Sequence, residues 1–464
     1  MDQMTAGRKE RVERVKDQFF GRERLMREIV AGVLAVPQPA SVSLVGSKLA
    51  GKSRLLAHLA SPQGPLRSAE LADWRPLPFR EAERVLVLLV DCDWHEARGD
   101  LLGHIAGRLA DLLAQATIDL AGEPEGEPGR RIGQVGRRLS RLGYRLVLLL
   151  DNFDILLEQE LLTPETVDAL RPLAREVGLV IATEQPLHDL DRDLAASPLF
   201  NVMTQLFVGL LETEAARQWL AAYRARFPAM TQIEEPLLQW TGNHPYLLYR
   251  LDDILSEVQG MLGPDGRICA EELPLVRLRL AEHGRLLFVT FWRTLHNPPR
   301  RIDPARLMGV VERLVAGKLR VDQVERNQIS TLNWLINQSM VIYNQQSYRL
   351  FSPLFGEFLA NRLARAAALA ARTQAAPTPL AHDALYAQLT KTESALLRYF
   401  QSHSHAVITP EQLLADVWKR PDASPRRVQE AIRRLRLELA QVSPPIGTIE
   451  NERGQGYRFI PAST

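Results

Sequence analysis

Residues 46–53, GSKLAGKS, have the residue types and spacing of a phosphate-binding loop. They fit the pattern GxxxxGK followed by Ser or Thr, come after the apolar run SVSLV and lead into the helical stretch RLLAHLA. Glycines in such a loop let backbone N–H groups surround phosphate oxygens, and the start of the helix adds its dipole. The lysine is expected to reach the β- and γ-phosphates, and the serine hydroxyl to ligate Mg²⁺. The sequence therefore predicts a site for ATP or ADP with Mg²⁺ at Gly46, Ser47, Gly51, Lys52 and Ser53.

Chemistry at the phosphates also needs an acidic group, and the apolar run RLVLLLD supplies one at Asp151. Its carboxylate is placed to hold Mg²⁺ through water together with Ser53, and a cap of the next segment is the alternative. In many hydrolytic members of this class a glutamate comes next, but this chain has Asn152, which cannot accept a proton. Either Asp154 substitutes or hydrolysis is slow. Thr183, at the end of LVIAT, is a catalytic candidate that senses the γ-phosphate, with a turn role as the alternative.

These residues need a scaffold, and the apolar pattern predicts one. Between residues 41 and 211 the runs SVSLV, VLVLLVD, RLVLLLD, LVIAT and QLFVGLL alternate with helical lengths, which indicates a parallel sheet covered by helices on both faces. Residues 213–280 look helical, and residues 281–365 are helical up to a hairpin at 345–347. The segment 366–384 is rich in Ala, Thr and Pro, so its first part reads as the end of a helix and the rest as a linker. A compact last module fills residues 385–464.

Composition limits the partners and the location. The 464 residues include 57 Lys+Arg and 55 Asp+Glu, a net charge of 57 − 55 = +2, so binding to nucleic acid must come from a local patch. Cys92 and Cys269 are too few and too far apart for a disulfide framework or a four-ligand zinc site. The charged N-terminus shows no secretory signal, and the apolar runs are far shorter than the ~20 residues of a membrane span. A cytoplasmic protein without membrane contact is expected.

Several segments resemble the STAND branch of the AAA+ ATPases, including the archaeal-type ATPase group. They are FFGRERL, LVLLLDNFD, SPLFNVMTQLFVGLLETEAARQWL and TGNHPYLL, within residues 17–280. The resemblance implies that Phe20, Gly21 and Arg22 pack near the adenine. It also implies that His244 and Pro245 of a helical lid approach the nucleotide, although a plain helix N-terminus with proline in its first turn is the alternative. Such proteins resemble switches that close with ADP, open with ATP and self-associate, so a homo-oligomer on ATP binding is expected.

The last module closely resembles the effector domain of the OmpR/PhoB-type response regulators over residues 389–460, with LTKTESALL, LLADVW, IRRLRLEL and RGQGYRF in order. Val428, Ile432, Leu435 and Leu439 recur at helical spacing, so the arginines between them should face the major groove of duplex DNA. The segment RGQGYRF supplies a wing whose arginine resembles the minor-groove contact of the family. The predicted DNA-binding residues are Arg420, Arg426, Arg427, Arg433, Arg434, Arg436 and Arg453.

The chain departs from the response regulators in two ways. Residues 366–388 do not look like the antiparallel sheet that normally precedes the first helix, and no phosphoacceptor receiver domain is present. The second departure implies that the ATPase carries the signal. The middle module, at about 281–365, also looks like a winged helix, but its basic residues lie outside the expected recognition helix STLNWLINQ. It therefore reads as an interaction or autoinhibitory domain.

The fold class that follows is multidomain α/β plus α+β. It comprises a P-loop NTPase parallel sheet (1–212) with a helical lid (213–280), a middle winged-helix domain (281–365), a linker (366–384) and a C-terminal winged helix-turn-helix domain (385–464). We expect a nucleotide-switched transcriptional regulator that binds duplex DNA, with a slow ATPase as the switch and a protein or small-molecule inducer as a further partner. The alternative is an AAA+ motor or scaffold that remodels or loads a protein partner on DNA. Steady turnover indicates a motor, and slow turnover a switch.

Overall fold

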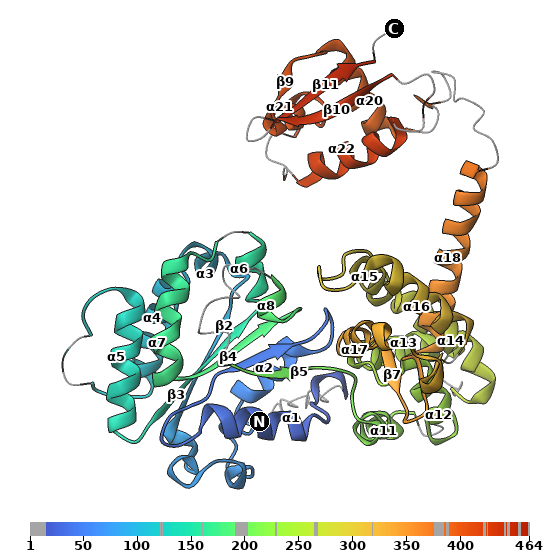
Figure 1. The fold of residues 1–464 in the computed structure, drawn as a ribbon. Helices are drawn as coiled ribbons and strands as arrows, with labels where there is room; N and C mark the ends of the chain where they lie inside the picture. The colour runs from blue at the N-terminus through green and yellow to red at the C-terminus, as the bar shows by residue number, and fades with distance from the viewer. Residues whose placement is uncertain are drawn as a thin grey trace, which may run out of the picture. The chain divides into compact units, whose positions relative to one another are not determined.

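The computed structural model divides the chain into two compact units, Met1–Leu363 and Ala364–Thr464 (Figure 1). The residues that it describes are 15–120, 122, 124–159, 161–190, 203–227, 230–263, 268–317, 319–374, 385–386, 389–420, 424, 426–439, 442, 446–452 and 456–462. Each unit is described by itself below. No helix within these ranges is both long enough and apolar enough to cross a membrane.

The described part of the first unit contains a five-stranded parallel sheet, which confirms the predicted fold class. Its strands are β1 (Val42–Val45), β2 (Val85–Asp91), β3 (Arg145–Asp151), β4 (Gly178–Thr183) and β5 (Thr204–Phe207). Their order is β2-β3-β4-β1-β5, and neighbouring strands pair in parallel. Because all strands run the same way, the loops after β1, β2, β3 and β4 meet at one edge of the sheet. Ligands of open α/β sheets bind at this carboxyl edge.

Helices cover both faces of the sheet (Figure 1). On one face, α1 (Glu23–Val33) and α2 (Lys52–Ala60) pack on β1, β3 and β4 in one apolar cluster. On the other face, α4 (Leu101–Gln115), α5 (Pro128–Arg141) and α7 (Pro164–Glu176) form a second cluster with β2, β3 and β4. The shorter elements are η1 (Val15–Asp17), η2 (Ala72–Trp74), η3 (Leu77–Phe79), η4 (Ala82–Arg84), α3 (His95–Gly99), α6 (Asp154–Glu158) and α8 (Leu187–Leu190).

A helical segment and a small winged helix follow the sheet and share one continuous apolar core, from Leu211 to Leu359. The helical segment contains α11 (Thr213–Ala222), η5 (Tyr223–Ala225), α12 (Met230–Thr241), α13 (Pro245–Leu262), η6 (Ala270–Glu272) and α14 (Leu273–His283). The winged helix contains α15 (Arg285–His296), α16 (Pro304–Ala316), β6 (Leu319–Arg320), η7 (Val321–Gln323), η8 (Arg326–Gln328), α17 (Ile329–Asn337), β7 (Val341–Tyr343) and β8 (Ser347–Leu350). Strands β7 and β8 form the hairpin that the sequence indicates at 345–347.

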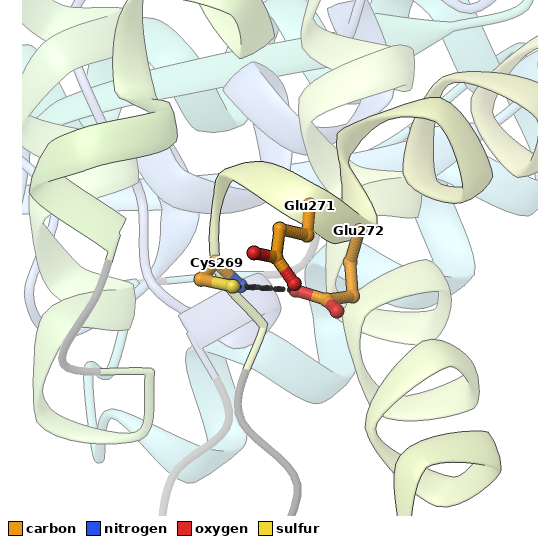
Figure 2. A group of neighbouring side chains, drawn as sticks. All are labelled: Cys269, Glu271 and Glu272. Atoms are coloured by element: carbon orange, nitrogen blue, oxygen red, sulfur yellow. Dashed lines mark hydrogen bonds between the residues drawn. The ribbon is translucent and has the colours of Figure 1, made fainter.

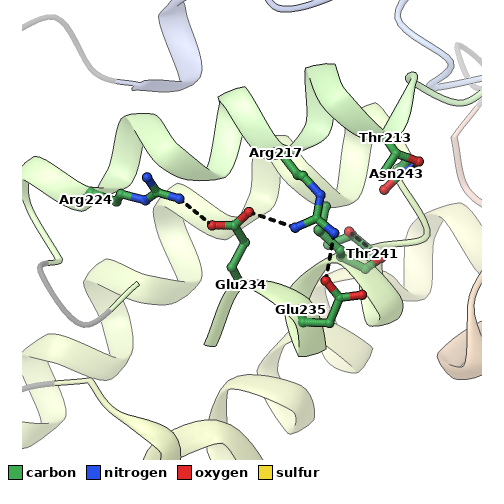
Figure 3. Close-up of polar contacts among 8 residues, drawn as sticks. Thr213, Arg217, Arg224, Glu234, Glu235, Thr241 and Asn243 are labelled. Atoms are coloured by element: carbon green, nitrogen blue, oxygen red, sulfur yellow. Dashed lines mark hydrogen bonds and ion pairs between the residues drawn. The ribbon is translucent and has the colours of Figure 1, made fainter. Parts of the chain in front are cut away.

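A buried carboxylate ties the first two lid helices together. Glu234 of α12 accepts hydrogen bonds from Arg217 of α11 at 3.2 Å and from Arg224 at 2.8 Å, and Figure 3 shows the two guanidinium groups on either side of it. Arg217 also pairs with the exposed Glu235 at 2.9 Å. Because Glu234 is largely buried, losing either arginine would leave a poorly compensated charge in the lid.

The second unit is a three-helix module with a three-stranded antiparallel sheet in its described residues. Its elements are α20 (Lys391–Ser402), β9 (Val407–Ile408), α21 (Pro410–Asp416), α22 (Arg426–Leu439), β10 (Gly447–Glu452) and β11 (Gly456–Pro461), with strand order β10-β11-β9. Helix α18 (Pro353–Gln374) spans the first part of the predicted linker, as expected for a helix end. The rest of that linker, 375–384, lies outside the described residues.

Candidate functional site: a nucleotide cavity and a basic helix

The P-loop lysine is buried against the carbonyl groups of its own loop. Lys52 begins α2 after Gly51, whose φ of 89° favours glycine, and only 8% of Lys52 is exposed. Its Nζ donates to Gly46 O at 2.6 Å and to Ser47 O at 3.2 Å. Burial lowers the pKa of Lys52, and Glu184 opposes that shift most strongly among the neighbouring carboxylates. A buried ammonium group of this kind is stabilised by an anion.

Two further observations fit the binding of a phosphate group by this loop. The Ser47 hydroxyl is buried and makes no hydrogen bond within the described chain, so an acceptor or donor is missing there. A Cβ atom at Gly46 would lie 2.7 Å from Val208 O, so a side chain is excluded and the backbone stays open. The predicted roles of Gly46, Ser47, Gly51 and Lys52 are consistent with this geometry.

The side chains expected to hold Mg²⁺ lie together. Asp151 ends β3, and its carboxylate accepts hydrogen bonds from the Ser53 hydroxyl and from Asn152 N. Burial raises the pKa of Asp151, whereas these two hydrogen bonds lower it. A hydroxyl and a carboxylate oxygen at the edge of a phosphate loop are the hard donors that Mg²⁺ prefers. Ser53 and Asp151 would therefore hold the metal, and the metal would neutralise charge on the phosphates.

A carboxylate that the sequence analysis did not single out adjoins this pair. Asp91 ends β2 and lies opposite Asp151 in the strand register. It accepts a hydrogen bond from Asn152 Nδ2 at 2.9 Å, and Asn152 adopts a φ of 52°. The asparagine after β3 thus bridges two strand ends. Only the pairing of β2 with β3 could have revealed this contact.

Asp154 and Thr183 support the turn after β4 instead of lining the cavity. The Thr183 side chain is fully buried, and its hydroxyl donates to Gln185 O at 2.7 Å. Asp154 accepts a hydrogen bond from Glu184 N at 3.1 Å. The next residue, Glu184, reaches the P-loop, where its carboxylate pairs with Lys48. The geometry matches the turn role that was the alternative for Thr183.

A cavity of about 370 Å³ extends from the P-loop to the lid. Its lining is largely aromatic and apolar on the lid side, where Phe20 and Trp219 stack with ring centroids 5.2 Å apart. The guanidinium group of Arg54 lies 5.6 Å from the Trp219 ring centroid. The lining residues are Phe19, Phe20, Arg22, Lys48, Leu49, Gly51, Lys52, Ser53, Arg54, Asn152, Glu184, Leu211, Trp219, Pro245, Tyr246 and Tyr249. Flat aromatic walls next to a phosphate loop suit a purine base.

The Gly-Arg segment braces the P-loop against the start of the lid. Arg22 Nη2 donates to Ala50 O at 2.7 Å and to Gly209 O at 2.9 Å. Burial lowers the pKa of Arg22 to about 10, and Glu212 opposes this shift. Gly21 has a φ of 69°, and a Cβ atom there would lie 2.5 Å from Ala215 Cβ. Arg22 lines the cavity, and its Nη2 is bound to these two carbonyl groups of the chain.

His244 lies away from the cavity, whereas Pro245 lines it. The imidazole is fully buried against the rings of Phe291 and Phe351, 5.7 and 5.5 Å away between centroids. Its Nδ1 accepts a hydrogen bond from Tyr246 N, which caps α13. The implied approach of His244 to the nucleotide is therefore not seen, because α13 starts at Pro245 and turns the imidazole toward the winged helix. This is the helix-N-terminus alternative.

One further group of candidate metal ligands occurs in the described residues: Cys269, Glu271 and Glu272, whose ligand atoms lie within 4.8 Å of one another (Figure 2). Both the backbone N–H and the thiol of Cys269 donate to Glu272, each at 2.8 Å. The two residues form the capping box of η6. These contacts give the group a structural role.

In the second unit, helix α22 presents arginines on its exposed side. Val428, Ile432, Leu435 and Leu439 are buried in the core of the unit, as the helical spacing predicts. The exposed arginines are Arg427, Arg433, Arg434 and Arg436 on α22, together with Arg420 before the helix. Arg426 starts the helix, and its side chain lies outside the described residues, as does Arg453 of the wing.

Two of these arginines have intramolecular partners. Arg434 forms an exposed ion pair with Glu430, 2.6 Å apart and one helical turn away. Such a pair is weak enough to open for another anion. Arg436 donates its Nε to Ile449 O at 2.8 Å and so joins α22 to the hairpin of β10 and β11. The hairpin contact gives Arg436 a structural role that the sequence did not indicate.

A comparison with protein families found a match to the second unit. Residues 386–459 match the family described as transcriptional regulatory protein, C terminal. This match identifies the segment as the C-terminal DNA-binding domain of a transcriptional regulator.

No curated protein matches the chain. Among solved structures, the chain is similar to the Walker-type ATPase of Pyrococcus abyssi, with 14% identity and a TM-score of 0.47 over 75% of this chain and 97% of that chain. It is also similar to the ORC2 protein of Aeropyrum pernix in ADPNP–ADP complexes, with 12% identity and a TM-score of 0.43 over 76% and 98%. The ORC1 protein of Aeropyrum pernix in complex with DNA shows 15% identity and a TM-score of 0.34 over 76% and 96%.

Proposed function

We propose that this chain is a nucleotide-switched DNA-binding regulator of the STAND type. The observation that carries the proposal is the composition of the cavity, whose walls come from both the P-loop and the lid. Lys52 and Ser53 offer a phosphate and Mg²⁺ site at one end, and Trp219 and Tyr249 offer aromatic walls at the other. ATP or ADP fits both ends. A nucleotide that contacts both parts would fix the lid relative to the sheet.

The lid is positioned to pass such a change to the middle winged helix. Gly242, in the turn before α13, lies so close to Phe351 that a Cβ atom would be 2.0 Å from Phe351 O. Ser352 donates its hydroxyl to Trp240 O at 2.5 Å. The two modules share one core, so a displacement of α13 displaces the winged helix as well.

A second contact joins the winged helix to the nucleotide-binding sheet. Arg301 Nη2 lies 2.7 Å from Asp189 Oδ2 in α8, which follows the β4 turn at the cavity. This ion pair supports the interpretation of residues 281–365 as an interaction or autoinhibitory domain. In the proposed mechanism, ATP favours self-association, and the DNA-binding domains of the assembly then engage repeated half-sites together.

Isothermal titration with ATP and ADP in the presence of Mg²⁺ tests nucleotide binding. Lys52→Ala should abolish binding, because the variant removes the ammonium group that faces the phosphates. Lys391→Ala is the control, since Lys391 starts α20 in the other unit and does not line the cavity. Unchanged affinity in Lys52→Ala would show that the site is assigned to the wrong residues.

A further inference from the structure

The described residues that line the cavity include one carboxylate, Glu184. It follows β4, and its Oε1 lies 3.1 Å from the Nζ of Lys48 in the P-loop. About a third of its side chain is exposed (32%), whereas 61% of the Lys48 side chain is exposed. Glu184 is therefore held at the phosphate end of the cavity by a residue of the loop that binds the phosphates.

The other carboxylates of this region are already engaged. Asp151 accepts hydrogen bonds from Ser53 and from Asn152 N. Asp154 accepts one from Glu184 N. Asp91 accepts one from the Asn152 side chain and one from Asp93 N. Within the described chain, Glu184 is therefore the acidic side chain that lines the cavity.

The electrostatic surroundings keep this carboxylate a usable proton acceptor. Burial raises the pKa of Glu184, and the charge of Asp154 raises it further. Lys48 and Lys52 oppose that shift. Among the neighbouring carboxylates, Glu184 also influences Lys52 most strongly. A base with a raised pKa beside the phosphates is suited to proton transfer.

We propose that Glu184 is the general base for hydrolysis of the γ-phosphate, with Lys48 as its positioning residue. The inference rests on the proposed nucleotide site. A water molecule beside Glu184 attacks the γ-phosphorus, and its oxygen forms the new P–O bond. The bond from phosphorus to the β–γ bridging oxygen breaks, and its electron pair leaves with ADP. The water proton passes to the Glu184 carboxylate and then to the released phosphate, which regenerates the base. This carboxylate fills the role that Asn152 cannot.

Glu184→Gln tests the proposal in the full chain, because the amide keeps the size of the side chain and loses the basic oxygen. We expect single-turnover hydrolysis of ATP to fall at least ~100-fold, the usual lower range for losing a general base. ATP affinity, measured by titration, should stay the same or increase, since one negative charge near the phosphates is gone. Glu158→Gln is the control: Glu158 influences Lys48 electrostatically but is exposed and does not line the cavity, so its hydrolysis rate should stay unchanged.

A rescue variant separates a catalytic role from a structural one. Adding Asn152→Glu to Glu184→Gln places a carboxylate at another position on the cavity wall and should restore part of the lost rate. If Glu184→Gln binds ATP and hydrolyses it at the wild-type rate, Glu184 is not the general base, and the proposed nucleotide site still stands. A wild-type chain that binds no ATP would instead overturn the proposed function, and this inference with it.

Discussion

Acidification should destabilise the lid through a single histidine. His244 is fully buried, and burial, aided by the charge of Arg22, lowers its pKa to about 3. An unfolded histidine has a pKa of about 6.5. Below that pH the unfolded state binds a proton that the folded state does not, so stability falls with pH until about pH 3. At pH 5 the difference spans about 1.5 pH units at 1.36 kcal/mol per unit, which gives a loss of about 2 kcal/mol relative to neutral pH.

Hydrogen exchange of the α13 amides measures this loss directly, because His244 caps that helix. The matched variant is His244→Asn, which keeps an acceptor at the cap and removes the titrating group. Wild type should lose about 2 kcal/mol more protection than the variant between pH 7 and pH 5. Other titrating groups affect both proteins and cancel in the comparison. Equal losses in the two proteins would show that His244 is not held neutral by burial in the folded state.

Three further predictions concern the lid, hydrolysis and DNA. Gly242→Ala should lower stability by about 1–3 kcal/mol in thermal unfolding, because Gly242 has a φ of 54° and faces a backbone oxygen. Gly260 has open space around it, so the control variant Gly260→Ala should keep the wild-type stability. Wild-type turnover should be ~1 per second or slower, and Asn152→Glu should raise it in a phosphate-release assay; a fast rate that the variant leaves unchanged argues against a switch. Replacing Arg433 and Arg434 should weaken DNA binding by ~1–3 kcal/mol per lost base contact and relax the sequence preference in DNA titrations. If the variant binds DNA as tightly as the wild type, α22 is not the helix that contacts the bases.

The scaffold and the phosphate loop were predictable because each depends on local pattern. All five strand runs, the loop at 46–53 and the hairpin near 345 were identified from apolar periodicity and turn residues. The same holds for the buried side of α22, whose apolar residues recur at helical spacing. Such features need no knowledge of which strands are neighbours.

The residues that the sequence did not reveal depend on contacts between distant segments. Asp91 joins the site only because β2 pairs with β3. Glu184 reaches the P-loop only through the turn after β4, where it pairs with Lys48. Trp219 follows the same apolar spacing as the lid core, so nothing local marks it as a cavity wall. His244 packs on Phe351, more than a hundred residues later in the chain.

We propose that nucleotide occupancy controls DNA binding, and a DNA titration in each nucleotide state tests this most directly. Wild type and Lys52→Ala are titrated with duplex DNA that carries tandem sites, in ATP·Mg²⁺, in ADP·Mg²⁺ and without nucleotide, at one fixed salt concentration. We expect ATP to tighten wild-type binding by ~1–3 kcal/mol, or roughly 5–150-fold, and to leave the affinity of Lys52→Ala unchanged. The same affinity of the wild type in all three states would contradict it.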